Sequence, residues 1–179
     1  VQGLAKGEKM DSVIRHATEL GVAAFMPLTC ERSIVKLDAK KTRTRLDRWC
    51  SIAKSAAMQS GQPRIPEVLE LRSAKEAAAE LAEATAVLIC WEEAPQTASL
   101  AQAIGRGLSE CSCPRGDARI AVIVGPEGGL TEREVGFFLD ANPRASLVSL
   151  GSSILRTETA GVVAPALTLY ELGKLGGTR

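Results

Sequence analysis

The chain has 179 residues, of which 24% are charged and 45% hydrophobic; this composition suits one globular domain and excludes a disordered, collagen-like or coiled-coil protein. An aromatic content of 3% argues against a protein that stacks many nucleic-acid bases, and the net charge of +1, taken alone, argues against nucleic-acid binding. No apolar run approaches the roughly 20 residues that cross a bilayer, and no signal peptide opens the chain. The five scattered cysteines and one histidine offer no metal site. We therefore expect a cytoplasmic protein with reduced thiols.

Segments of helical and strand character alternate along the sequence. Apolar residues at helical spacing predict helices, short apolar runs predict strands, and two capping boxes, at 73–76 and 131–134, open two of the helices. In chain order we expect a helix over 10–20, a strand over 23–28, a helix over 42–60, a strand over 67–71, a helix over 73–83, a strand over 85–91, a helix over 97–108, a strand over 120–124, a helix over 131–141, a strand over 145–150 and a helix over 157–172. This alternation predicts an α/β fold with a mostly parallel sheet and helices on both faces.

The average charge conceals a strongly basic segment. Residues 32–54 contain eight basic side chains and two acidic ones, whereas residues 76–110 contain six glutamates and one arginine. Leu46, Trp49 and Ala53 recur at helical spacing within the basic segment, so it predicts a helix with one apolar and one basic side. A basic side is either a solvated face or a surface for phosphates, and the net charge of +1 therefore does not exclude RNA.

The last predicted helix is apolar around most of its circumference, through Val162, Val163, Ala166, Leu167, Leu169, Tyr170 and Leu172. A helix of this kind must be buried on several sides. It is either a central core helix or a contact with a partner subunit.

Two glycine-containing loops each follow a predicted strand and open a helix. The first, Gly125-Pro126-Glu127-Gly128-Gly129, lies where open α/β sheets bind ligands, and it lacks the P-loop and dinucleotide-binding patterns. The second loop spans residues 149–160. In it, Gly151 permits a tight turn, and Ile154 and Leu155 supply an apolar wall. Arg156 stands at a helix start, where the helix dipole does not favour a cation, which indicates a polyanionic partner or pairing with a local acid such as Glu158.

The two loops, Gly-Pro-Glu-Gly-Gly-Leu-Thr-x-x-Glu and Leu-Gly-x-x-Ile-Leu-Arg-Thr-Glu-Thr-Ala, resemble those of the RsmE-type methyltransferases of the SPOUT superfamily, which methylate N3 of a uridine in small-subunit (16S) ribosomal RNA. Shorter matches lie at 6–11, 17–22, 27, 31–33, 59–61 and 65–67. The chain departs from the family pattern at Gln62, where the family usually has Arg, and at Ser152-Ser153, where it usually has Pro-Arg.

The resemblance implies a C-terminal trefoil knot, S-adenosylmethionine as cofactor, and a homodimer through the knot and the last helix. It further implies an N-terminal PUA-like RNA-binding domain, so we expect residues 1–179 to be the SPOUT methyltransferase domain of a two-domain protein. The implied cofactor residues are Cys90, Trp91, Gly125, Pro126, Glu127, Gly128, Gly129, Leu150, Gly151, Ser153, Ile154 and Leu155.

For catalysis, Arg156 is the first candidate to hold a substrate phosphate or the negative charge that develops on the uracil. Glu127 and Glu158 are candidates for the base that accepts the N3 proton, although either could instead accept hydrogen bonds from loop amides. The target uridine must be unpaired or flipped out of a helix. Candidates for contact with 16S RNA phosphates are Arg32, Lys36, Arg43, Arg48 and Arg64.

Two other interpretations fit parts of the sequence. One is a non-catalytic RNA-binding dimer that keeps the knot and has lost the cofactor, and the intact loop motifs argue against it. The other is a nucleotide-binding α/β protein unrelated to RNA, which would lack the usual phosphate-binding signatures. Titration with S-adenosylmethionine separates the enzyme from the RNA-binding dimer.

Overall fold

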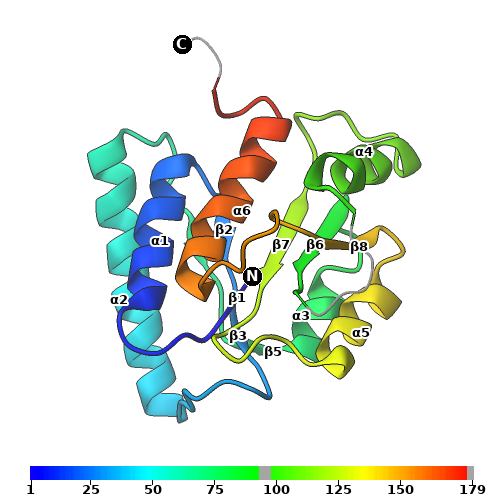
Figure 1. Cartoon of the computed structure of the whole chain (residues 1–179). Helices are drawn as coiled ribbons and strands as arrows, with labels where there is room; N and C mark the ends of the chain where they lie inside the picture. The colour runs from blue at the N-terminus through cyan, green and yellow to red at the C-terminus, as the bar shows by residue number, and fades with distance from the viewer. Residues whose placement is uncertain (93–97, 177–179) are drawn as a thin grey trace.

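The computed structural model describes residues 1–92 and 98–176 and shows an α/β fold (Figure 1). The strands are β1 (Gln2–Gly3), β2 (Ala24–Phe25), β3 (Pro27–Thr29), β4 (Glu67–Val68), β5 (Arg72–Ser73), β6 (Ala86–Cys90), β7 (Ile120–Val124) and β8 (Ala145–Val148). The helices are α1 (Lys9–Leu20), α2 (Ala39–Ser60), α3 (Ala74–Glu80), α4 (Leu100–Glu110), α5 (Glu132–Ala141) and α6 (Thr157–Glu171).

Six strands form one parallel sheet in the order β5-β3-β1-β7-β6-β8, and β2 pairs with β4 in a second, two-stranded parallel sheet. Because β6 lies between β7 and β8, the carboxyl ends of these three strands are neighbours at one edge of the sheet. Loops that follow them in the sequence therefore meet in space, which is the arrangement that binds ligands in open parallel sheets.

Helices cover both faces of the sheet, as predicted. Alternate residues of β6 point to opposite faces: Val87 and Ile89 pack in the cluster that contains the α3 and α5 residues Ala77 and Phe138. Ala86 and Leu88 pack in a second cluster with Leu100, Ala103 and Ile104 of α4. A third cluster joins α1 to α2, through residues such as Ile14, Trp49 and Ala53. Strands buried on both faces explain why the strand runs are continuously apolar.

The structure corrects three sequence-based expectations. The strand expected over 67–71 is limited to β4 at 67–68, and the next strand, β5, begins at Arg72 in the other sheet. The apolar run at 23–28 is not one strand, because β2 pairs with β4 while β3 pairs with β1 and β5. The two-residue strand β1, which no pattern indicated, lies in the middle of the sheet between β3 and β7. The predicted helix at 97–108 corresponds to α4, and Thr97 lies outside the described residues.

Helix α6 packs against α1, α4 and β7 through a stripe of small residues: Thr157, Ala160, Gly161, Ala164 and Thr168. A β-carbon at Gly161 would lie 2.5 Å from Gln2 Oε1 and 2.9 Å from Val13 Cγ2, so a larger residue would displace these side chains of β1 and α1. The rest of the helix surface is only partly covered by the described residues: Val162, Val163, Ala166 and Leu169 are half-buried, and Leu167 and Tyr170 are 40% and 61% exposed. The apolar circumference noted in the sequence is therefore only partly used within this chain.

No helix within residues 1–92 and 98–176 is long and apolar enough to cross a membrane. The five cysteines, all within these residues, form no disulfide.

Candidate functional site

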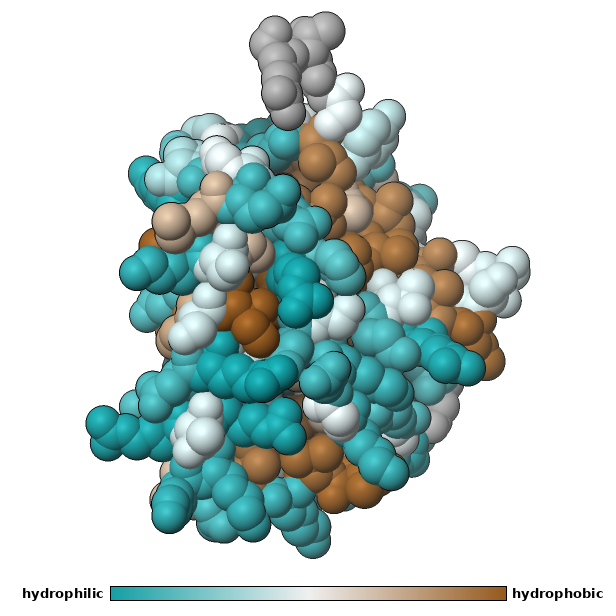
Figure 2. All heavy atoms as spheres, turned by 90° about the vertical axis from the view of Figure 1, so that its left-hand side faces the viewer, coloured by the Kyte–Doolittle hydropathy of each residue, from teal (hydrophilic) through white to brown (hydrophobic). Residues whose placement is uncertain are grey.

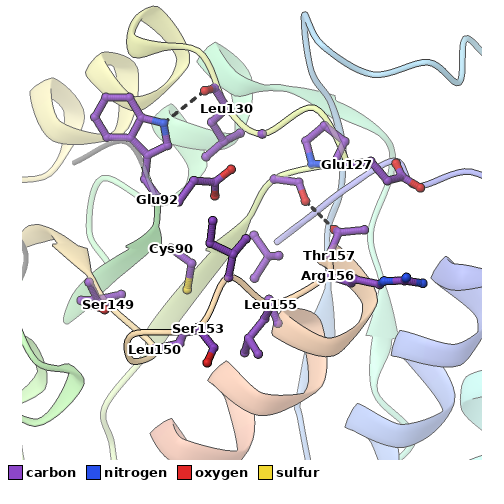
Figure 3. Close-up of a pocket in the computed structure, with 18 of the residues that line it drawn as sticks. Cys90, Glu92, Glu127, Leu130, Ser149, Leu150, Ser153, Leu155, Arg156 and Thr157 are labelled. Atoms are coloured by element: carbon purple, nitrogen blue, oxygen red, sulfur yellow. Dashed lines mark hydrogen bonds between the residues drawn. The ribbon is translucent and has the colours of Figure 1, made fainter.

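A cavity of about 590 Å³ opens at the carboxyl ends of β6, β7 and β8 (Figure 3). Its walls are formed by Cys90–Glu92 at the end of β6, by the first glycine loop after β7, and by residues 149–157 after β8. All of the residues that the family resemblance assigned to the cofactor line this cavity except Gly128. At Gly128 a β-carbon would lie 2.9 Å from the backbone oxygen of Arg32, so this glycine faces the 30–33 segment instead.

The second loop turns sharply before it reaches α6. Gly151 has a φ of +122°, a conformation that other residues rarely adopt, and this agrees with the tight turn predicted there. Leu150 and Leu155 are half-buried in the cavity wall, whereas Ile154 lies at the rim with 84% of its surface exposed. The apolar wall predicted from the sequence is therefore formed mainly by the two leucines.

A buried hydroxyl joins the two glycine loops. Thr157 Oγ1 donates a hydrogen bond to the carbonyl oxygen of Gly125 at 2.5 Å and accepts one from Gln2 Nε2 at 2.8 Å (Figure 3). All three groups are buried. The start of α6 is thus fixed to the end of β7 and to β1, and sequence reasoning missed both Thr157 and Gln2.

Lys9 lies between two carboxylates at the cavity edge. Its Nζ is 2.9 Å from Glu127 Oε1 and 3.5 Å from Glu158 Oε2, and Glu127 Oε1 also accepts the backbone N–H of Lys6 at 3.0 Å. Burial alone would raise the pKa of the Glu127 carboxyl, but the hydrogen bonds from Lys9 and from backbone amides outweigh it and hold that pKa below 4.5. The hydrogen bond with Glu127 also raises the pKa of Lys9.

The two carboxylates named as candidate bases differ in their surroundings. Glu127 is committed to Lys9 and Lys6, and its low pKa makes it a weak proton acceptor. Glu158 does not line the cavity; its buried Oε2 accepts no hydrogen bond within residues 1–92 and 98–176, but it forms an ion pair with Lys9 at 3.5 Å. The sequence left the choice between them open, and in the structure Glu127 is the more fully hydrogen-bonded of the two.

Two further side chains at the end of β6 shape the cavity. Burial raises the pKa of the Cys90 thiol to about 12, so this thiol is neutral and serves as an apolar wall. Glu92 projects into the cavity (Figure 3) and forms no hydrogen bond or ion pair with the described part of the chain. Sequence reasoning missed Glu92, although its position directly after Cys90 and Trp91 was a usable signal.

Arg156 is the N-cap residue of α6 and is exposed, and its side chain makes no capping hydrogen bond. It lies at the cavity edge, and in Figure 3 its guanidinium points outward, away from Cys90 and Leu155. Glu158 pairs with Lys9, and no ion pair joins it to Arg156. The alternative that a local acid satisfies this arginine therefore finds no support in the described residues.

The five residues proposed for RNA contact do not form one cluster. Arg32 lies against the first glycine loop, where its Nη1 donates to the Gly128 carbonyl at 3.3 Å. Arg48 pairs with Asp11, with Nε 2.8 Å from Oδ2. Lys36 and Arg43 are exposed near the start of α2, and Arg64 is exposed beyond its end. Since the 22 residues of α2 span roughly 33 Å, Arg64 is far from Lys36 and Arg43 at the start of the helix.

The start of α2 is the end close to the cavity. Arg45 Nη1 lies 3.5 Å from the carbonyl oxygen of Gly7, which immediately precedes the Lys9 region, whereas Gln62 at the other end bonds to Glu19 at the end of α1. Helices α1 and α2 therefore run side by side in the same direction.

Among residues 1–92 and 98–176, no cluster of side chains could hold a metal ion.

A family model for an RNA methyltransferase domain matches residues 1–169. The ribosomal RNA small subunit methyltransferase E of Bacillus subtilis (strain 168) is 36% identical over 98% of this chain and 66% of its own length. The protein of the same name from Mycobacterium bovis is 34% identical over 92% of this chain and 59% of its own length. The chain thus spans about three fifths to two thirds of these relatives.

Solved structures of methyltransferases are also similar to this chain. The ribosomal RNA small subunit methyltransferase E of Neisseria gonorrhoeae, bound to S-adenosylmethionine, aligns with a TM-score of 0.75 and 32% identity over 94% of this chain and 63% of that one. A putative methyltransferase of Legionella pneumophila, in complex with the same cofactor, aligns with a TM-score of 0.78 and 29% identity over 95% of this chain and 64% of that one. The family resemblance drawn from the two glycine loops is confirmed, and the chain belongs to the RNA methyltransferase domain family.

Proposed function

We propose that this chain is the S-adenosylmethionine-dependent catalytic domain of an enzyme that methylates N3 of a uridine in small-subunit (16S) ribosomal RNA. The observation that carries this proposal is the cavity at the ends of β6, β7 and β8, formed by the loops whose motifs match the family. The relatives from Bacillus subtilis and Neisseria gonorrhoeae are both named ribosomal RNA small subunit methyltransferase E, and the second was solved with S-adenosylmethionine bound. Action on ribosomal RNA would place the protein in the cytoplasm.

The cavity residues fit the cofactor. A volume of about 590 Å³ lies within the range of small-molecule sites. Leu130, Val148 and Leu155 offer an apolar surface for a purine, and glycine-loop backbone groups offer hydrogen bonds. Glu92 offers an uncommitted carboxylate for an ammonium group or ribose hydroxyls. S-Adenosylmethionine, when bound, supplies an electrophilic methyl group on a positively charged sulfur.

The chain's own residues then have three tasks. The apolar wall excludes water, which strengthens the electrostatic interactions inside the site. Arg156, pointing outward at the cavity mouth, holds the substrate phosphate or the negative charge on the uracil once N3 has lost its proton. Glu158 is the proton acceptor that we propose, because Lys9 lies 3.5 Å from its Oε2, whereas Glu127 accepts hydrogen bonds from both Lys9, at 2.9 Å, and the backbone of Lys6.

Replacing Glu92 by glutamine is expected to weaken the affinity for S-adenosylmethionine about tenfold, because charge-assisted hydrogen bonds from the ligand lose their acceptor charge. Calorimetric titration measures the change. Glu132→Gln, which removes the same charge from an exposed position on α5, is the matched control and should bind as the wild type does. Equal affinities for all three proteins would remove Glu92 from the proposed site.

For RNA, we propose a face formed by the first half of α2 and the segment that precedes it. Figure 2 views the molecule from the side of α2 and shows a predominantly hydrophilic surface with separate apolar patches. Arg43→Gln is expected to lower the salt slope of 16S RNA binding by about 0.7, since one phosphate contact is lost. Arg64→Gln, at the far end of α2, should leave the slope unchanged. Electrophoretic titrations at several salt concentrations decide, and equal effects would contradict this face.

We further propose a homodimer that covers the exposed apolar side of α6, including Leu167 and Tyr170. The chain returns from the edge strand β8 to pack α6 against β7 and α1, and we propose that this return is threaded as the C-terminal trefoil knot. Sedimentation equilibrium tests the dimer: a monomer at all concentrations would contradict it.

The function is tested by mass spectrometry of small-subunit ribosomal RNA from cells with and without the gene. We expect one 3-methyluridine to disappear on deletion and to return when the full gene is restored. Unchanged modification would contradict the proposal, and loss of a methyl group from another atom would contradict the N3 assignment alone.

A further inference from the structure

One ammonium group ties together three segments that are far apart in the sequence. Lys9 is the first residue of α1, Glu127 belongs to the loop after β7, and Glu158 lies in the first turn of α6. The Lys9 Nζ lies 2.9 Å from Glu127 and 3.5 Å from Glu158. Glu127 and Lys9 both line the cavity, and Glu158 directly follows Thr157, the last residue of the wall formed after β8, without lining the cavity itself.

No other cation pairs with either carboxylate within the described ranges 1–92 and 98–176. The Lys9 side chain is 33% exposed, and the Glu127 and Glu158 side chains are 26% and 25% exposed, so solvent screens this cluster only in part. Without Lys9, two like charges would face each other across the junction of the two loops. Their repulsion would separate the cavity walls.

We propose that Lys9 is a positioning residue, which holds the first glycine loop and the start of α6 at the spacing that the cofactor needs. This inference rests on the proposed function, because it assumes that the cavity binds S-adenosylmethionine. Lys9 acts through Glu127 and Glu158. Its contribution is to preorganise the cavity, so its loss should affect ligand affinity more than folding.

The test is calorimetric titration with S-adenosylmethionine, together with melting curves of the free proteins. Lys9→Met should weaken binding about tenfold, the effect of losing one charge-assisted hydrogen bond. Lys9→Arg should restore affinity to within about threefold, because the longer cation can reach both carboxylates. Arg15→Met is the matched control, since it removes a cation from an exposed position on the same helix and should bind normally.

A double-mutant cycle identifies the partner. If Lys9 acts through Glu127, the two substitutions are not additive. The variant that combines Lys9→Met with Glu127→Gln should then bind S-adenosylmethionine about as tightly as whichever single variant has the lower affinity. Should Lys9→Met fail to fold, Lys9→Gln takes its place under the same criteria: weakened binding that Lys9→Arg restores supports the inference, and normal binding overturns it.

The outcomes separate this inference from the proposed function. Absence of binding by the wild-type chain contradicts the proposed function itself. Normal binding by Lys9→Met, or equal loss in Lys9→Met and Arg15→Met, overturns only the role of Lys9. Weak binding by Lys9→Met that Lys9→Arg does not restore also overturns it, because it would show a packing effect in place of a charge.

Discussion

Replacing Thr157 by valine is expected to lower the free energy of unfolding by about 2–6 kcal/mol and to weaken S-adenosylmethionine binding at least tenfold. Valine has nearly the shape of threonine, but it removes the hydroxyl that bridges Gln2 Nε2 and the Gly125 carbonyl. Each of these buried groups then loses its main partner, at about 1–3 kcal/mol apiece. The affinity falls because the Gly125 end of β7 is no longer fixed to the start of α6.

Chemical denaturation and calorimetric titration measure the two effects. Thr157→Ser keeps the hydroxyl and is the matched control, so its affinity should stay within about threefold of the wild type. If valine and serine behave alike, the hydroxyl bridge does not hold the two loops together.

The second large effect is expected for Arg156→Ala, which should slow methyl transfer about 10²–10³-fold while leaving cofactor affinity within about threefold. The guanidinium points out of the cavity and makes no capping hydrogen bond, so its removal affects neither the cavity wall nor the helix start. The change in unfolding free energy should stay within about 0.5 kcal/mol.

Single-turnover rates with 16S RNA and saturating S-adenosylmethionine give the effect on the transfer step itself. Arg156→Lys should recover part of the rate, because it keeps the charge and loses the planar fork. Arg15→Ala serves as the control for charge on an exposed helix surface. A normal rate for Arg156→Ala would exclude this residue from the reaction.

Local signals predicted much of the fold. The strand at 120–124 has the predicted bounds, because five consecutive apolar residues buried on both faces leave little choice of structure. The helices α3 and α5 begin at the predicted capping boxes, and both reciprocal hydrogen bonds of each box are present. These features depend on residues within a few positions of one another, which a single sequence reveals.

Pairing between distant segments could not be predicted in the same way. Strand β1 has two residues and no periodicity, and it exists because Gln2 has strand partners at Pro27 and Val124. The run at 23–28 divides because its two halves find different partners; Pro27, the first residue of β3, was the one local sign of a break within it.

The same limit applies to the site. The loops were predicted because their glycines and strand positions are local features, and their motifs matched a family. The residues that hold the loops together were not, because Lys9 and Glu127 are 118 positions apart and Gln2 and Thr157 are 155 apart. Family motifs included Lys9 and Thr157 as matching residues, but only the structure shows what they contact.

The central claim, that the three loops form one methyl-donor site, is tested most directly by a crystal structure of this chain with S-adenosylhomocysteine, the demethylated product. We predict electron density for the product in the cavity, in contact with the loops after β6, β7 and β8 and with Glu92, while the Thr157 bridge and the Lys9 ion pairs remain. Density at any other place on the protein, or an empty cavity at saturating product concentration, would contradict the account.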